Sequence, residues 1–434
     1  MSQVKVIGAG LAGCEAALYL ANKGVKVTLY DIKPHKFTPA HSSEKLGELV
    51  CSNSLKSNDI YGNACGLLKE EMRKLGSVII SAGDETRVPA GNALAVDREK
   101  FAEYITEKVQ NNANITFVSQ EITKIPTDCY TVIATGPLTT DDLSQEIAKI
   151  TGGGMFFYDA SAPIISAESI DKECSFVGDR YGKGNGDHIN CPMEKEEYLA
   201  FYNALISAER AKLHDFENLS VFEGCMPVEI MAQRGVDTLR FGPLKPKGLK
   251  NPKTDKSSYA CLQLRKEDAC GNAYNMIGFQ TNLTFPEQKR VFSMIPALKN
   301  AEFLRYGVMH RNTFINAPKC LNADLSLKDN GKVFFAGQIT GVEGYVESAA
   351  MGLLAGINVY LQLSGKESLK LDNKTVIGAL SNYVATPNID FQPMNANYGI
   401  LEVGEQIRDK SERKKRQAER SLKEIERIKE IIEQ

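Results

Sequence analysis

Tryptophan is absent from this chain of 434 residues, histidine occurs five times, and neither basic nor acidic residues are in clear excess. The formal net charge of −2 argues against a globally basic nucleic-acid coat protein but leaves room for a local basic patch. Hydrophobic residues make up 43% and charged residues 24%, as in globular chains with a sizeable core. The length predicts two or three domains.

Long apolar runs are also missing from the sequence. We find no stretch of roughly 18 or more apolar residues, the length that crosses a bilayer. The N-terminus enters an apparent strand almost at once ("MSQVKVIGAG"), which leaves no room for a charged leader and a cleavage site. The sequence therefore predicts a cytoplasmic protein without a membrane partner.

Ten cysteines are scattered along the chain without a CxxC pair or a Cys/His cluster at zinc spacing, so no metal site is predicted. In a cytosolic chain most cysteines are expected to be reduced, buried and inert. Cys225, in "FEGCMPVEIMAQRG", stands between glycine and methionine with carboxylates on either side. The residues around it do not decide between core packing and a nucleophile.

A nucleotide-binding pattern opens the chain. Val4, Val6 and Ile7 predict a short strand, a GxGxxG turn and a helix follow, and a second strand ends at Asp31. Glycines permit the tight turn, the approach to a pyrophosphate and close helix packing, and the acid accepts hydrogen bonds from ribose hydroxyls. The predicted turn consists of Gly8, Ala9, Gly10, Leu11, Ala12 and Gly13.

Two later segments indicate that the dinucleotide is FAD. "CYTVIATGP" (129–137) contains Gly136, and "VFFAGQITGVEGYVESAAMGLLAGINVY" (333–360) predicts a strand, a glycine-rich turn and a helix rich in small residues. A nucleotide fold completed more than 300 residues downstream is the layout of FAD proteins, although an ordinary core strand and helix would read alike. We assign Gly337, Gln338, Glu343 and Gly344 to the cofactor site.

The predicted fold class is α/β, with a Rossmann-like FAD-binding domain of the glutathione-reductase-like flavoprotein type and an inserted mixed α+β domain. We expect residues 1–154 to begin the FAD-binding domain, 155–325 to form the insertion, and 326–434 to complete the first domain. Apolar spacing predicts helices over 194–213 and 409–434, the second with a narrow apolar stripe that docks on its own domain or a partner.

The insertion carries a basic segment, residues 234–266, with nine Lys or Arg against two acids. Such a block suits an RNA backbone because neutralised phosphates release counterions, but a solvated lysine face has the same composition. The candidate RNA contacts are Arg234, Arg240, Lys245, Lys247 and Lys250. Contact through Arg413, Lys414, Lys415 and Arg416 of the last helix is a less favoured alternative.

Several motifs, in order along nearly the whole chain, resemble the folate- and FAD-dependent tRNA (uracil-5-)-methyltransferases. They are "GAGLAGCEAA", "ELVCSNSLKS", "VPAGNALAVDREKF", "ATGPLT", "FEGCMPVEIMAQRG", "VMHRNTFIN", "FAGQITGVEGYVESAA" and "FQPMNANYGI". Many relatives have glutamate where this chain has Asp31, and either carboxylate can hold a ribose hydroxyl. The related wobble-uridine modifying flavoproteins share the first motif but have a longer C-terminal region.

The resemblance implies transfer of a one-carbon unit from methylenetetrahydrofolate to C5 of a uridine, with reduction by FAD that NADH or NADPH replenishes. The family's nucleophilic cysteine matches Cys225, its second cysteine near the flavin matches Cys51, and its flavin-side tyrosine matches Tyr345. Cys51 is also compatible with a purely structural role. The expected RNA is tRNA, with 23S rRNA, a wobble-type reaction and a non-enzymatic flavin- and RNA-binding protein as alternatives.

Covalent catalysis would require a thiolate at Cys225, because uracil C5 becomes a nucleophile when sulfur adds at C6. A nearby cation or N–H dipole would lower the pKa of this thiol. Glu223 and Glu229 would raise that pKa if they faced the sulfur, whereas Arg234 or the basic segment would lower it. The sequence leaves this balance open.

Overall fold

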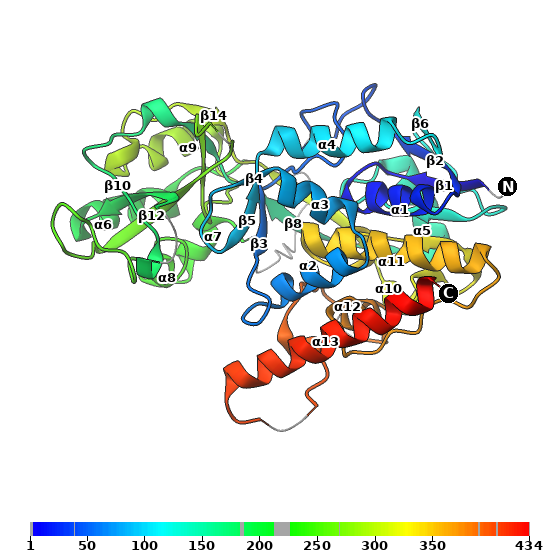
Figure 1. Ribbon diagram of the computed structural model, residues 1–434. Coiled ribbons are helices and arrows are strands. Elements are labelled where there is room, and N and C mark those ends of the chain that lie inside the picture. Colours follow the sequence, from blue (N-terminus) through cyan, green and yellow to red (C-terminus); the bar gives the residue numbers. More distant parts are fainter. Residues whose placement is uncertain are drawn as a thin grey trace.

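The computed structural model describes residues 3–38, 40–182, 186–211, 226–268, 270–388, 391–404 and 407–433. Figure 1 shows two regions side by side, with the last helix lying along the lower edge of the first region. The first region contains both ends of the chain, and the second is formed by the middle of the chain.

The first region is built on a six-stranded sheet of order β16-β17-β7-β1-β2-β6. β1, β2, β6, β7 and β17 run parallel, and β16 pairs antiparallel at one edge. This arrangement confirms the predicted Rossmann-like α/β class. The strands are β1 (Gln3–Ile7), β2 (Lys26–Asp31), β6 (Ile115–Ser119), β7 (Thr131–Ile133), β16 (Ser326–Leu327) and β17 (Asn330–Phe335).

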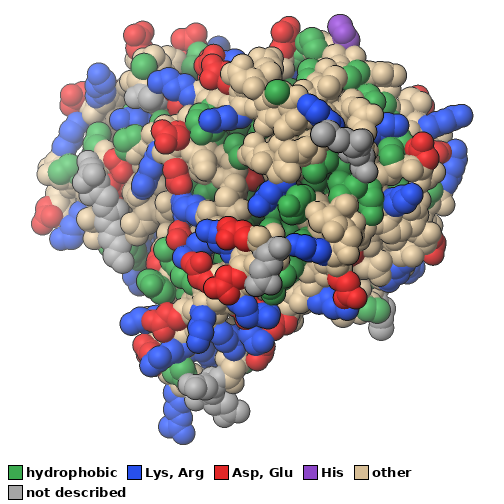
Figure 2. Space-filling view, turned by 45° about the vertical axis from the view of Figure 1, so that its right-hand side comes forward, with side chains coloured by type: hydrophobic (Ala, Val, Ile, Leu, Met, Phe, Trp, Pro, Cys, Tyr) green, Lys and Arg blue, Asp and Glu red, His purple; other side chains and the backbone are tan. Residues whose placement is uncertain are grey.

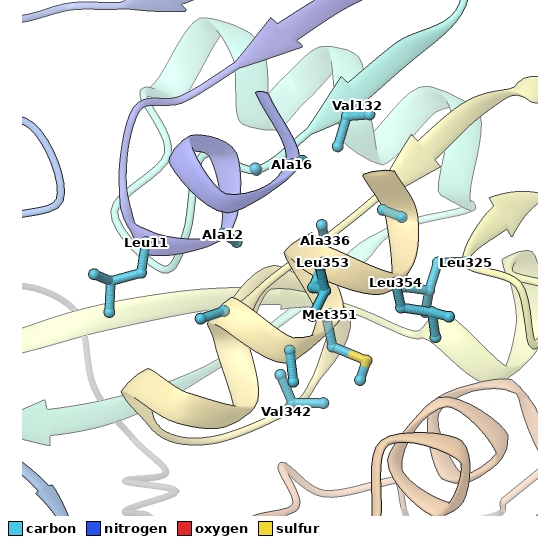
Figure 3. Close-up of a cluster of buried hydrophobic side chains, with 14 of the residues drawn as sticks. Leu11, Ala12, Ala16, Val132, Leu325, Ala336, Val342, Met351, Leu353 and Leu354 are labelled. Atoms are coloured by element: carbon cyan, nitrogen blue, oxygen red, sulfur yellow. The ribbon is translucent and has the colours of Figure 1, made fainter. Parts of the chain in front are cut away.

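Helix α1 (Leu11–Asn22) packs against α11 (Tyr345–Leu363), more than 300 residues away, as Figure 3 shows around Ala12, Ala16 and Leu353. Glycine makes this approach possible. A Cβ atom on Gly352 would lie 2.2 Å from the Ala12 carbonyl oxygen, and one on Gly356 would lie 3.2 Å from the Ala16 Cα. The small residues of this helix therefore allow its close approach to the α1 backbone.

By length and composition, α11 is apolar enough to cross a membrane, which the sequence analysis did not anticipate. The apolar stretch is 83% buried inside the fold, since the helix runs through the core of the first region. Its hydrophobicity is explained by this packing. No other helix of the described ranges meets the same criterion.

The remaining helices of the first region surround this core. They are α2 (Ala64–Lys74), α3 (Val78–Glu85), α4 (Arg98–Gln110), α5 (Asp141–Thr151), α10 (Ala317–Cys320), α12 (Val376–Ala385) and α13 (Lys410–Glu433). α13 confirms the predicted C-terminal helix, and Ala418, Ile425, Ile428 and Ile432 of its stripe are buried. Ser421 of α13 donates to Glu71 of α2, so the helix docks on its own domain.

The second region is a six-stranded antiparallel sheet of order β10-β11-β12-β13-β9-β14 with helices on one side. Its strands are β9 (Ile164–Ser166), β10 (Phe176–Val177), β11 (His188–Met193), β12 (Ala260–Lys266), β13 (Ala273–Met276) and β14 (Phe303–Arg305). Its helices are α6 (Lys195–Ser207), α7 (Val228–Gln233), α8 (Thr238–Phe241) and α9 (Phe285–Phe292). α6 ends six residues before the predicted helix.

This sheet has one apolar and one polar face, because side chains alternate along a strand. Leu262, Leu264 and Met276 pack in a core with Phe201 of α6 and Phe292 of α9. Phe176 and Cys261 of the other face form a small apolar cluster with Leu249, while four further residues of this face are polar and also nearly buried. They are Asn190, Gln263, Arg265 and Asn275. The polar face meets the first region, as the contacts of Arg265 below demonstrate.

Two smaller elements connect the regions. β8 (Gly154–Ala160) and β15 (Met309–Ile315) pair antiparallel where the chain leaves and re-enters the first region. β3 (Ser54–Ser57), β4 (Arg87–Val88) and β5 (Ala93–Val96) form a three-stranded sheet of order β3-β5-β4. Each region has one large hydrophobic core among the described residues, while the domain boundaries at 154/155 and 325/326 stay a prediction.

Candidate active site

The turn after β1 has no room for side chains. Gly8 has a φ of +99°, and a Cβ there would lie 2.5 Å from the Ala134 carbonyl oxygen. A Cβ on Gly13 would lie 1.7 Å from the Gly8 carbonyl oxygen. These two glycines therefore bring α1, β1 and β7 together, as the motif predicts.

Gly10 has the opposite surroundings. No atom lies within 4 Å of the position that its Cβ would take, and the residue borders a pocket enclosing about 1150 Å³, part of it open to solvent. A side chain at this position would enter the pocket. The open cradle at the start of α1, where helical N–H groups lack partners within the helix, fits the phosphates of a dinucleotide.

Asp31 lies in the same pocket at the end of β2. Its Oδ2 accepts from the Ala9 N–H at 2.6 Å and its Oδ1 from the Lys33 N–H at 2.9 Å. The carboxylate thus fixes the first turn and presents its remaining lone pairs to the pocket, which suits the predicted bond to a ribose hydroxyl.

The pocket brings together most of the predicted cofactor residues. The lining includes Gly8, Ala9, Gly10, Leu11, Ala12, Asp31, Gly136, Gly337, Gln338 and Tyr345. Three predicted residues do not line it. Gly13 lies beneath the turn, Glu343 accepts from the Gln338 Nε2 at 2.5 Å, and Gly344 precedes α11.

The sequence analysis missed other lining residues, among them Thr38, His41, Glu48, Gln120 and Thr139. Gln120 had a usable signal. It follows β6, whose residue Ser119 pairs with Asp31, so both carboxyl ends meet at one sheet edge. His41 had none, because it reaches the pocket from a loop. Burial lowers the pKa of His41, which favours its neutral form.

Tyr345 connects this pocket to Cys51, the second of the two predicted catalytic cysteines. Its hydroxyl oxygen accepts from the Cys51 N–H at 2.7 Å and from the Ser52 N–H at 3.2 Å. Burial raises the pKa of Tyr345, so the phenol keeps its proton. The half-buried Cys51 Sγ lies 3.7 Å from the Ala160 carbonyl oxygen at the end of β8. The structure therefore brings Cys51 and Tyr345 together at the pocket's edge.

An arginine of the second region holds the same loop. Arg265 donates from Nη2 to Ser52 Oγ at 2.8 Å and from Nε to Asn53 Oδ1 at 2.9 Å. Asn53 Nδ2 in turn donates to the Val96 carbonyl at 3.0 Å and the Lys266 carbonyl at 2.8 Å. The loop after Cys51 is thus bonded to both regions.

Arg98 completes these contacts from the start of α4. It donates to the Leu49 carbonyl and, through Nε and Nη2 at 3.1 and 2.9 Å, to Glu267 Oε2. Although burial opposes the charge of Arg98, attraction to Glu267 leaves its pKa raised. Cys51 and Tyr345 also interact electrostatically with both Arg98 and Arg265. Sequence reasoning singled out neither arginine.

Cys225 and Glu223 lie outside the described residues. Immediately after them, the Val228 N–H donates to the Gln280 carbonyl at 2.7 Å, and the Thr281 N–H donates to the Ser161 carbonyl at 3.3 Å. Ser161 follows Ala160, which contacts Cys51. The chain just after Cys225 is therefore bonded, through Gln280 and Thr281, to the segment that borders Cys51.

Glu229 does not stand free to face a thiol. It is buried, and it accepts from Thr281 Oγ1 at 2.9 Å and from the Asn282 N–H at 2.8 Å. Burial raises the pKa of Glu229, against these hydrogen bonds. Its role in the described structure is to join α7 to residues 281–282.

The five predicted RNA contacts differ in their surroundings. Arg240 lies 3.6 Å from the Tyr259 ring centroid and pairs with Asp237 at 2.5 Å, so it is engaged within the protein. Arg234, Lys247 and Lys250 are exposed, and Lys245 is half-buried. Lys250 makes a long ion pair with Asp255, at 3.6 Å, with both side chains largely exposed. The segment is not a single uniform patch.

Figure 2 shows basic side chains gathered at the lower projection of one face, where α13 begins. Two residues of the basic run 413–416 are engaged within the protein. Lys414 donates to the Gly62 carbonyl at 2.9 Å and lies 5.2 Å from the Tyr398 ring centroid. Arg416 pairs with Glu412 at 3.0 Å. The contacts of Lys414 belong to the docking of α13, whereas the Arg416 pair lies within the helix itself.

Comparison with known proteins places this site in context. The family described as GIDA, glucose inhibited division protein A, matches residues 3–367. Proteins named methylenetetrahydrofolate--tRNA-(uracil-5-)-methyltransferase TrmFO are similar over the full length. The one from Acetivibrio thermocellus is 56% identical over 423 residues, 97% of each chain, and one from Listeria monocytogenes is 54% identical over 432 residues, 99% of each chain.

Among solved structures, Aquifex aeolicus GidA in its form II crystal aligns with a TM-score of 0.71 at 18% identity. The alignment covers 98% of this chain and 73% of the GidA chain. The form I crystal gives a TM-score of 0.69 at 18% identity and covers 90% and 70% of the two chains. At this identity the likeness concerns the fold.

Proposed function

The chain belongs to the GIDA family and to the TrmFO methyltransferases, and from this membership we propose that it is a methylenetetrahydrofolate--tRNA-(uracil-5-)-methyltransferase. It transfers a one-carbon unit from the folate to C5 of a uridine in RNA. The reaction takes place where the nucleotide pocket meets the Cys51 loop. A cytoplasmic location is part of the same proposal.

The pocket residues fit FAD, because the turn at Gly10 is open and a carboxylate stands at the end of β2. The N–H groups of the turn would hold the phosphates and Asp31 the ribose, while Gly136, Gly337 and Gln338 also line the pocket. When bound, FAD supplies the electron equivalents that reduce the one-carbon unit, and NADH or NADPH restores them. The protein's part is to orient the cofactor and to exclude water from the site.

We assign to Cys225 the role of nucleophile. Its thiolate adds to C6 of the uracil, forming a C–S bond, and the electron pair of the C5–C6 bond moves toward C5 and O4. C5 then attacks the electrophilic methylene carbon, and the electron pair of its C=N bond moves to the nitrogen that carries it. Loss of the C5 proton to a base expels this nitrogen and leaves an exocyclic methylene. The two-electron reduction that bound FAD would supply then converts it to methyl, while the C–S bond breaks and the C5–C6 double bond forms again. The hydrogen bond from Val228 to Gln280, and the one from the next residue, Thr281, to Ser161, support this role, since they connect the segment after Cys225 to the Cys51 site.

Cys51 acts beside the bound cofactor. Its backbone N–H is held by Tyr345 and the neighbouring Ser52 by Arg265, so the thiol has a defined place between both regions. This is the observation that carries the proposed function. A half-buried loop held by an uncharged tyrosine and two arginines is the kind of environment that supports thiol chemistry rather than simple packing.

The RNA partner is a tRNA, with 23S rRNA as the alternative substrate for the same chemistry. Lys247, Lys250 and Arg234 are exposed and able to reach phosphates, and Lys245 is half-exposed. Arg240 is engaged within the protein, so its contribution to the basic segment is its packing on Tyr259.

The deciding experiment supplies the purified protein with labelled methylenetetrahydrofolate, NADH or NADPH, and a tRNA transcript, with 23S rRNA fragments in parallel. We expect label in 5-methyluridine of the tRNA. Label on the rRNA fragments alone would identify 23S rRNA, and not tRNA, as the substrate. Flavin and RNA binding without label would contradict the enzymatic function, and activity that requires a partner GTPase would indicate a wobble-type enzyme.

A further inference from the structure

Three aromatic rings stack in parallel at the edge of the second sheet. The Tyr306 ring lies between Phe285, at a centroid distance of 4.9 Å and an interplanar angle of 13°, and Phe303, at 5.3 Å and 7°. Phe285, the first residue of α9, keeps 50% of its surface exposed. Neither Phe285 nor Tyr306 belongs to the hydrophobic cores formed by the described residues. The stack therefore offers an aromatic surface to solvent.

Its middle ring is fixed at the boundary between the two regions. On one side, Arg305 Nη2 donates to the Ala40 carbonyl of the first region at 3.2 Å. On the other side, the Gly307 N–H donates to Gln288 Oε1 at 2.8 Å, and a Cβ on Gly307 would lie 2.5 Å from the Ser161 carbonyl oxygen. Tyr306 cannot shift without breaking contacts on both sides.

The same contacts connect the stack to the loop that contains Cys51. Ser161 follows Ala160, whose carbonyl lies next to the Cys51 sulfur. Arg305 interacts electrostatically with Cys51 and Tyr345, although burial is the main cause of its lowered pKa. The rings are thus connected to the Cys51 site through one residue on either side of Tyr306.

A positive charge accompanies the exposed ring. Lys289 lies one helical turn after Phe285, on the same side of α9, and is exposed. It forms no ion pair with any residue that the structure describes, whereas the adjacent Arg290 pairs with Glu287 at 2.6 Å. An exposed ring next to an uncommitted cation matches the two needs of single-stranded RNA, a stacking surface for a base and a partner for its phosphate.

We propose that the Phe285–Tyr306–Phe303 stack is a binding site for an unpaired base of the substrate RNA, next to the uridine that is modified. This inference rests on the proposed function. A uridine that reacts with a cysteine must leave its neighbours, which exposes the face of an adjacent base. Phe285 receives that base by stacking, and Lys289 pairs with its phosphate.

The test compares Phe285→Leu, which keeps an apolar side chain without a ring, with Phe285→Trp, which keeps the ring. Binding of an unmodified tRNA transcript is measured over a range of salt concentrations. We expect about tenfold weaker binding for Phe285→Leu, near wild-type binding for Phe285→Trp, and the same salt dependence for both, because no charge changes. Tyr61→Leu, at a ring 47% exposed in the first region, is the matched control and should bind normally.

Flavin absorbance and circular dichroism verify that each variant is folded. A cross-linking arm with wild-type protein and a transcript carrying 4-thiouridine next to the target avoids the folding question, and we expect the cross-link in the tryptic peptide 267–289. Equal binding by Phe285→Leu and wild type, or cross-links elsewhere only, would overturn the inference. Absence of RNA binding by the wild-type protein would overturn the proposed function with it.

Discussion

The nucleotide pocket and the Cys51 loop lie next to each other but are built from different parts of the chain. The pocket depends on glycines and on one carboxylate within the first 31 residues, together with two later turns. The loop depends on side chains that are far apart in sequence, namely Tyr345, Arg98 and Arg265. A local motif thus forms the cofactor site, whereas the reactive site forms only when both regions have folded against each other.

The largest effect is expected from filling the pocket. Gly10→Val places a branched side chain in the open space that faces the phosphates, so the purified variant should lack yellow flavin and methyl transfer. Gly331→Val is the matched control, because the Cβ position of Gly331 is also free of neighbours but lies outside the pocket. Flavin absorbance after purification measures retention. Full flavin content in Gly10→Val would contradict the assignment.

Next in size is the effect of breaking the buried pair beside Cys51. Arg98→Met leaves Glu267, 6% exposed, without its cation and should lower the free energy of unfolding by about 3 kcal/mol. Lys370→Met removes an ion pair whose two side chains are 87% and 86% exposed and should change it by less than about 1 kcal/mol. Denaturant unfolding measures both. Equal stabilities would show that the pair contributes little to joining the regions.

A smaller effect is expected for Arg265→Lys, which keeps the charge but cannot bond Ser52 and Asn53 together. We expect a stability loss of about 1–2 kcal/mol and an altered rate of alkylation at Cys51, with flavin retained. Exposed Cys270 is the internal reference, since the substitution does not change its surroundings at the surface. If the ratio of the Cys51 and Cys270 rates is the same as in wild type, Arg265 does not position the thiol.

The smallest effect concerns the basic segment. Exchanging Lys247 and Lys250 for Gln should weaken tRNA binding several-fold and lower the slope of log K against log salt by about one for each lysine that contacts a phosphate. Lys366 and Lys370 of the first region, changed in the same way, serve as controls. An unchanged slope would place the RNA on another surface.

The sequence predicted the parts of the fold that local patterns encode. The GxGxxG turn, the acid at the end of β2, the small-residue helix α11 and the C-terminal helix α13 with its apolar stripe were all readable, because each follows from residue size and periodicity. Whether α13 docks on its own domain or on a partner was left open by the sequence and is answered by its contact with Glu71. The C-terminal end of helix α6 was predicted six residues too late in the sequence, since the apolar spacing continues beyond Ser207. That α11 is long and apolar enough to cross a membrane was not predicted, because polar residues interrupt its apolar run.

The contacts around Cys51 could not be predicted in the same way. Arg265 belongs to a strand whose sequence alternates polar and apolar residues, which normally indicates a face turned to water. In the structure that face is covered by the first region, and Arg265 is 8% exposed. Only tertiary structure reveals that this arginine is a partner of Ser52 and Asn53. The motif resemblance led to Cys51 and Tyr345 but contained no indication of the arginines that hold them.

The most direct test of the central claim is single-turnover methyl transfer by Cys225→Ala with reduced, FAD-loaded protein and a tRNA transcript. Our account predicts full flavin content, RNA binding like wild type and no label in the RNA, whereas the control Cys270→Ala stays active. Label transferred by Cys225→Ala at the wild-type rate would contradict the assignment of Cys225 as the nucleophile that works next to the Cys51 loop.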